Sequence, residues 1–89
     1  MLVIHKYSLP AAETKLSLPL GATPLSFGFQ KGVPVLWCLI NNEEKTVEDR
    51  TFRGFETGEL IDKSLKSFIG TISDEGIIHH LFEIENESR

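Results

Sequence analysis

The stretch Val33-Pro34-Val35-Leu36-Trp37-Cys38-Leu39-Ile40, closed by Asn41-Asn42, decides the fold of this chain. Read as a strand, it is apolar on both of its alternating faces, with Trp37 on one side and Cys38 on the other. It is too short to cross a membrane, and the two asparagines are typical turn residues. We therefore expect a central strand that is covered on one face by a second layer of the same chain and on the other by a further layer or a partner subunit.

Short segments of alternating hydrophobicity lie on both sides of this run. They cover residues 2–7, 14–20, 25–30, 50–56, 68–72 and 77–84, and turn residues separate them. Residues 57–65 hold the only plausible helical turn, and Gly54 is expected to form a β-bulge that brings Phe52 and Phe55 to the same side. The pattern predicts an all-β fold, a small antiparallel sandwich or partly open barrel of about six to seven short strands with at most one short helical turn.

Size and composition favour one small folded domain. Hydrophobic residues make up 40% and charged residues 25% of the 89 residues, so we expect a single β domain over residues 1–85 and a polar tail over 86–89. A domain of this size buries little surface, and we expect a homo-oligomer. The net charge of −4 disfavours nucleic-acid binding. The lone Cys38 fits a reducing compartment, and the absence of a signal peptide favours a cytoplasmic protein with no membrane contact.

The histidines are the most chemically suggestive residues. His79 and His80 are neighbours on an expected strand and point to opposite faces, so they cannot readily share a metal ion. His80 is in register with Phe82 and Ile84 on the expected core side, where it is either a hydrogen-bonded core residue or a base in a pocket. Because no zinc spacing, phosphate loop or nucleophile motif accompanies them, we expect no metal, no cofactor and no enzymatic activity.

Two arginines give the best candidate for ligand binding. Arg50 and Arg53 flank Phe52 and precede the Thr57-Gly58 turn, and a guanidinium beside an aromatic ring can hold an anionic or planar ligand. We therefore name Arg50, Arg53, Thr57 and His80 as the candidate ligand-binding set. The alternative is that both arginines are solvated on an exposed face.

Several segments together carry a resemblance to a known family. They are Ile4-His5-Lys6-Tyr7, the run from Phe29-Gln30-Lys31-Gly32 to Trp37, Glu56-Thr57-Gly58, Phe68-Ile69-Gly70-Thr71 and His80-Leu81-Phe82-Glu83-Ile84. In this order they resemble small uncharacterised proteins of bacteriophages and prophages, in which "KY-x-L", "QNG-x-P-x-LW" and "HVFE" segments recur. The resemblance implies a phage origin and a place in the host bacterial cytoplasm, and it implies no mechanism.

Two functions follow as expectations. The first is a non-enzymatic accessory protein that binds a host or phage protein or assembles with itself. The alternative is a counter-defence protein that sequesters a small nucleotide signal in a pocket within or between subunits.

Overall fold

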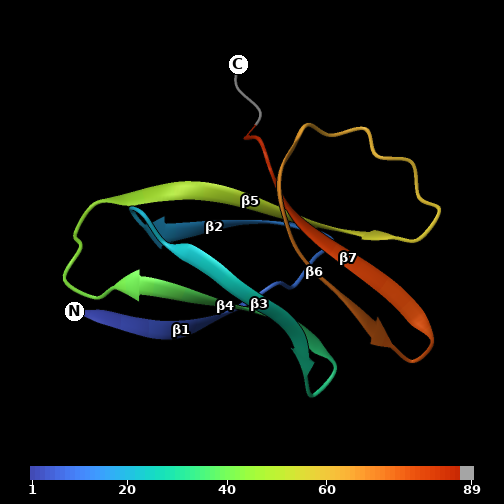
Figure 1. Ribbon diagram of the computed structural model, residues 1–89, viewed down its shortest axis with the longest axis horizontal. Coiled ribbons are helices and arrows are strands. Elements are labelled where there is room, and N and C mark those ends of the chain that lie inside the picture. Colours follow the sequence, from blue (N-terminus) through green and yellow to red (C-terminus); the bar gives the residue numbers. More distant parts are fainter. Residues whose placement is uncertain (87–89) are drawn as a thin grey trace.

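The computed structural model describes residues 1–86 (Figure 1). These residues form seven antiparallel strands, which are arranged in two sheets. The strands are β1 (Leu2–Ser8), β2 (Glu13–Pro19), β3 (Thr23–Gln30), β4 (Val33–Asn41), β5 (Val47–Glu56), β6 (Leu65–Asp74) and β7 (Ile77–Ile84). The all-β prediction is confirmed, and the two sheets do not close into a barrel. Of the predicted polar tail, residues 87–89 lie outside the described residues.

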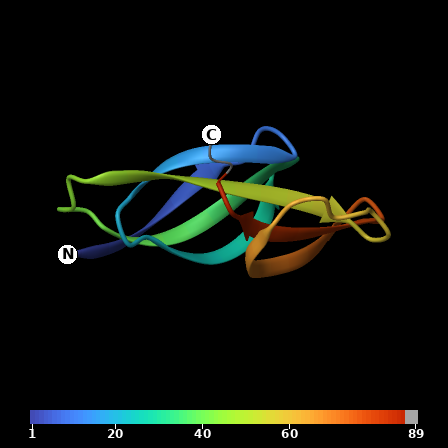
Figure 2. The same cartoon turned by 90° about the horizontal axis from the view of Figure 1, so that it is seen from above.

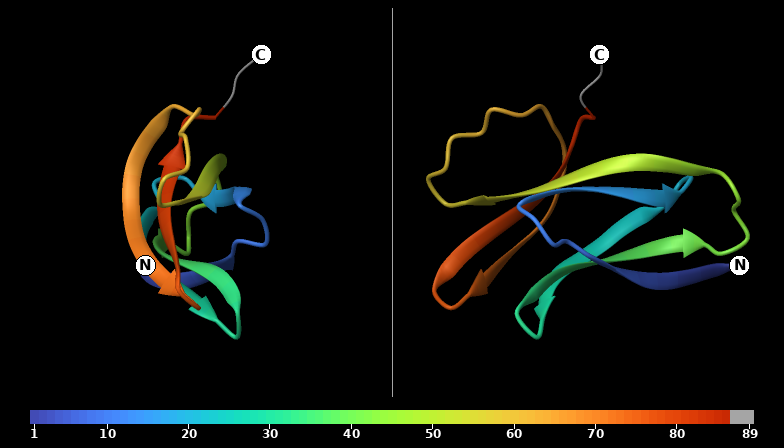
Figure 3. Two further views of the ribbon diagram at one scale, coloured as in Figure 1. Left: turned by 90° about the vertical axis from the view of Figure 1, so that its right-hand side faces the viewer. Right: turned by 180° about the vertical axis from the view of Figure 1, so that it is seen from behind.

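The chain passes back and forth between the two sheets. Sheet A has the order β1-β4-β3 and sheet B the order β2-β5-β7-β6, so β1 to β2, β2 to β3 and β4 to β5 are crossings. Figure 2 shows the two layers from above, and Figure 3 shows the twist of the strands from the side and from behind. The result is a thin molecule of 39 × 35 × 18 Å.

The hydrophobic core lies between the two sheets, and one face of β4 contributes side chains to it. Leu36, Cys38 and Ile40 are at most 4% exposed and belong to one cluster with Leu18 and Phe52. Residues two apart on a strand share a face, so this is the inward side of the central strand. The sequence run that was expected to form the centre of the fold is therefore central in sheet A.

The other face of β4 has no second layer within residues 1–86. Val35 is buried there by neighbouring side chains, whereas Trp37 and Leu39 stay half-buried. Trp37 lies across β3 at Gly28, where an added Cβ would come within 3.1 Å of the indole ring. The chain itself thus covers only one of the two apolar faces.

Two local features that the sequence suggested, one short helical turn at most and a bulge at Gly54, are both absent from residues 1–86. Residues 57–64 form a loop without a helical turn, and Gly58 turns the chain there with a φ of 91°. Gly54 forms no bulge, because β5 pairs with β7 in an unbroken register through Gly54 and Leu81. Phe52 and Phe55 therefore face opposite sides of sheet B, and both are buried.

Candidate functional site

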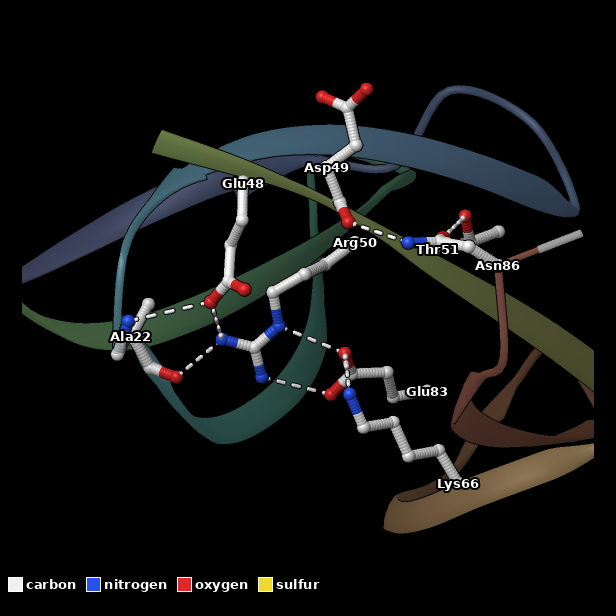
Figure 4. A network of polar contacts seen from close by, with 9 residues as sticks. Ala22, Glu48, Asp49, Arg50, Thr51, Lys66, Glu83 and Asn86 are labelled. Carbon is white, nitrogen blue, oxygen red and sulfur yellow. Dashed lines mark hydrogen bonds and ion pairs between the residues drawn. The ribbon is translucent and has the colours of Figure 1, made fainter. Parts of the chain in front are cut away.

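Arg50 lies on the inward face of β5, in a buried ion pair (Figure 4). Its Nε and Nη2 donate to the two carboxylate oxygens of Glu83 at 2.8 and 2.9 Å, and its Nη1 donates to the Ala22 carbonyl at 2.6 Å. The two side chains are 13% and 4% exposed. Arg50 is therefore not a solvated side chain, and its hydrogen bonds tie β5 to β7 and to the β2–β3 turn.

Further charges surround this pair. Glu48 lies 3.6 Å from Arg50, and Lys66 lies 3.9 Å from Glu83. The hydrogen bonds that Arg50 donates to Glu83, and then the charge of Glu83, raise the pKa of Arg50 above its usual value against the cost of burial. Because the guanidinium has partners on all sides, we assign it a structural role.

Arg53 points to the opposite, outer face of sheet B. Its Nη2 lies 2.7 Å from Glu59 and its Nη1 3.5 Å from Glu13, while its guanidinium lies 4.9 Å from the centre of the Phe55 ring. Arg53 therefore covers a buried aromatic ring and is neutralised by two carboxylates. Arg50 and Arg53 do not share a site.

His80 also lies on the outer face, and the expectation that it points into the core is wrong. Its neighbour Leu81 belongs to the core instead. The His80 ring bridges two hydroxyls, with Nε2 2.8 Å from Thr57 Oγ1 and Nδ1 2.9 Å from Thr71 Oγ1. Of the four candidate residues, the structure brings only Thr57 and His80 into contact.

A cleft lies at the end of the core where sheet A passes into sheet B. Its volume is about 460 Å³. Its lining combines the apolar residues Leu9, Pro10, Ala11, Ala12, Phe27, Pro34, Phe52, Gly54 and Leu81 with the polar residues Arg53, Glu56, Glu59 and His79. Sequence reasoning chose His80 as the inward histidine and so missed this cleft.

The sheets differ in how their edges are protected. In sheet A, β3 contains Pro24 and a register shift beside it. In sheet B, β6 has two register shifts, and the open side of β2 presents the charged Glu13 and Lys15 and then Pro19, which has no N–H. Bulges, prolines and charges all hinder the pairing of an edge with another strand.

The edge of β1 has no proline and no register shift. Its seven residues pair with β4 without a register shift, and bonds from Asn42 N to Met1 O and from Leu9 N to Pro34 O extend the ladder at both ends. Since alternate residues face β4, the N–H and C=O groups of Leu2, Ile4, Lys6 and Ser8 point to the open side. Lys6 donates from Nζ to Gln30 on β3, so its charge is turned away from that side.

These features define a small open two-sheet all-β domain, with one unprotected edge and one cleft described above. Over residues 1–89 the chain matches a domain of unknown function, DUF7352, and it belongs to that family. No curated protein and no solved structure matches it. Within residues 1–86, no helix is long and apolar enough to span a membrane, and no three His, Cys, Asp or Glu side chains gather as for a metal ion.

Proposed function

We propose that this protein is a small non-enzymatic accessory protein, encoded by a phage or prophage, that acts by self-assembly through the edge of β1. The observation that carries the proposal is the contrast between this regular edge and the three protected ones. The phage origin, and with it the host bacterial cytoplasm, rests on the resemblance of the sequence segments. The hydrogen bonds on both ring nitrogens of His80 support a role without catalysis.

The chemistry of β1 suits pairing with a second copy. In an antiparallel pair centred on His5, all seven residues find a partner, and the four outward-facing residues supply about eight main-chain hydrogen bonds, two for each bonded pair. Ile4 then lies opposite Lys6 of the partner subunit, and no two acids or two lysines face each other. Leu2 and Ile4, 64% and 56% exposed, would gain a neighbour.

Such pairing would extend sheet A to six strands. The exposed side chains of Leu2 and Ile4 lie on the same outer face of sheet A as Trp37 and Leu39 of β4. The face is fixed by the register, in which Ile4 pairs with Leu39. The apolar outer face would therefore become continuous across two subunits. Strand addition of this kind also binds foreign strands, so an edge of a host or phage protein could compete for β1.

Sedimentation equilibrium with matched proline variants tests the proposal. Ile4→Pro removes an N–H that points to the open side, so the monomer should keep its fold and the dimer should be lost. His5→Pro removes an N–H that points to β4, so it should destabilise the monomer itself.

Charge variants test the register. Ile4→Lys should abolish association, because it faces Lys6 of the partner subunit, whereas Ile4→Glu should retain it. A wild-type protein that stays monomeric at millimolar concentration would overturn self-assembly. A dimer that Ile4→Pro leaves intact would show that the β1 edge is not the interface.

The alternative, sequestration of a small nucleotide, has less support. Of the two arginines proposed to hold an anion, Arg50 is committed to Glu83 and Arg53 to Glu59 and Glu13. A phosphate would have to displace carboxylates that are already in place. We therefore prefer a protein partner, and a titration with cyclic and ADP-ribose-type nucleotides that shows tight binding would reverse that preference.

A further inference from the structure

We propose that the cleft beside Gly54 binds a small organic cation with a flat apolar body, such as an arylalkylamine. The cleft has the size and composition of a small-molecule site, with about 460 Å³ and a mostly apolar lining. Its apolar part is formed by buried side chains of both sheets, Phe27 from β3 and Phe52 and Leu81 from sheet B. Such a surface favours a flat hydrophobic group over a polar one.

Gly54 keeps this space open. It occupies an inward position of β5, opposite Leu81, where neighbouring inward residues such as Phe52 fill the core. Its φ is not positive, and a Cβ built on it would meet no atom within 4 Å. Neither backbone conformation nor crowding therefore requires glycine here. A larger side chain would fill the cleft and bury more apolar surface, so the glycine leaves room that a ligand can take.

The polar groups of the cleft favour a cation. The lining includes two acidic residues, Glu56 and Glu59, and one arginine, Arg53, whose guanidinium is already paired with Glu59 at 2.7 Å. Within residues 1–86 the Glu56 carboxylate makes no ion pair or hydrogen bond, although its backbone N–H is held by Glu59. An ammonium group at the mouth of the cleft would give Glu56 a counter-charge.

His79 supplies a second anchor. It lies opposite Glu56 in the β5–β7 register, half-buried, with its ring 5.5 Å from that of Phe29. Among the described residues neither of its ring nitrogens has a hydrogen-bond partner. His79 can therefore flank an aromatic ligand and exchange a hydrogen bond with it.

A pair of probes with the same ring and opposite charge tests the proposal. The full chain is titrated with 1-naphthylmethylamine and with 1-naphthylacetate, and the amide signals of Gly54 and His79 are followed by NMR. We expect the amine to bind at least tenfold more tightly than the acid, with the largest shifts at these two residues. No shift with either probe at 10 mM, or tighter binding of the acid, would overturn the proposal.

Four variants separate the contributions. Gly54→Leu should fill the cleft and weaken amine binding at least tenfold while the protein stays folded, and Gly54→Ala gives a graded effect if the larger residue prevents folding. Glu56→Gln should remove most of the preference for the amine. Glu75→Gln, in the β6–β7 turn, removes the same charge from a residue that does not line the cleft and should change nothing. Unchanged amine binding in both glycine variants would contradict the proposed site.

This site is independent of the association proposed above. The Ile4→Pro variant should bind the amine as the wild type does, because Ile4 does not line the cleft. Loss of dimerisation with retained binding, or the reverse, would therefore separate the two proposals.

Discussion

The outer faces of the two sheets differ in what covers them. On sheet B, Phe55 is 2% exposed, beneath the guanidinium of Arg53 and beside the ring of Phe82. On sheet A, Ile4 is 56% exposed, and no layer lies over the neighbouring Trp37 within residues 1–86. The chain thus covers Phe55 in the middle of sheet B with its own side chains, although Phe68 on the edge strand β6 is 58% exposed, and it leaves Ile4 on β1 exposed.

This difference separates stability from association. A covered apolar side chain contributes to folding, whereas an exposed one can contribute only when a second surface arrives. The unprotected edge of β1 borders the bare face and not the covered one. Substitutions on sheet B should therefore change the free energy of unfolding, and substitutions on the outer face of sheet A should change association.

Loss of the ion pair between Arg50 and Glu83, on the inward face of sheet B, should have the largest effect on the free energy of unfolding. Arg50→Met leaves Glu83 buried without its main partner and should cost about 3–5 kcal/mol of unfolding free energy. Urea unfolding at neutral pH measures this loss. The double variant Arg50→Met/Glu83→Leu should regain most of it, and a single variant that costs under about 1 kcal/mol would show that the pair does little for the fold.

Phe55→Ala tests the covered face directly. Because the ring is buried, its loss should cost about 3 kcal/mol, measured by the same unfolding experiment. Phe68→Ala is the matched control, since Phe68 is 58% exposed on the same sheet and should cost much less. Equal effects would mean that the outer face of sheet B is not covered as described.

The free energy of unfolding should depend on pH through the buried thiol of Cys38. Burial raises the pKa of its thiol to about 11, with a smaller upward effect of Glu83 opposed by Arg50. Since the pKa is raised on folding from 9.0, this contribution is intact below pH 9 and declines as pH rises from 9 towards 11. The total is on the order of 2–3 kcal/mol at the upper limit. Cys38→Ala should flatten the alkaline part of the stability profile, and an unchanged slope would refute the assignment.

Ile4→Ser should have the smallest effect on stability. Its side chain is exposed, so the unfolding free energy of the monomer should change by less than about 0.5 kcal/mol. The dimerisation constant should nevertheless weaken, which sedimentation at several concentrations measures. A large loss of monomer stability would contradict the division of roles between the two outer faces.

Local patterns in the sequence were enough to predict the strands but not their pairing. Alternation and turn residues placed strands close to the observed ones, and the run ending at Ile40 was recognised as central. Sheet order depends on contacts between distant segments, such as Arg50 with Glu83, which no short pattern encodes. The ion pair of Arg50 with Glu83 could therefore not be predicted from the sequence.

The orientation of the histidines could not be predicted for a related reason. On β7, both Leu81 on one face and Ile84 on the other are buried, so alternation alone cannot tell which histidine points inward. Gly54 was interpreted as a bulge because two aromatic residues were assumed to share a face. They occupy opposite faces, and the glycine lines a cleft instead.

Amide hydrogen exchange in β1 measures directly whether its open edge pairs with a second copy. In the monomer, the amides of Val3, His5 and Tyr7 point to β4, whereas those of Ile4 and Lys6 point to the open side. We expect the Ile4 and Lys6 amides to exchange quickly in dilute protein and to slow down as concentration rises, and we expect both to stay fast in the Ile4→Lys variant. Exchange at Lys6 that stays fast at every concentration would contradict pairing through β1.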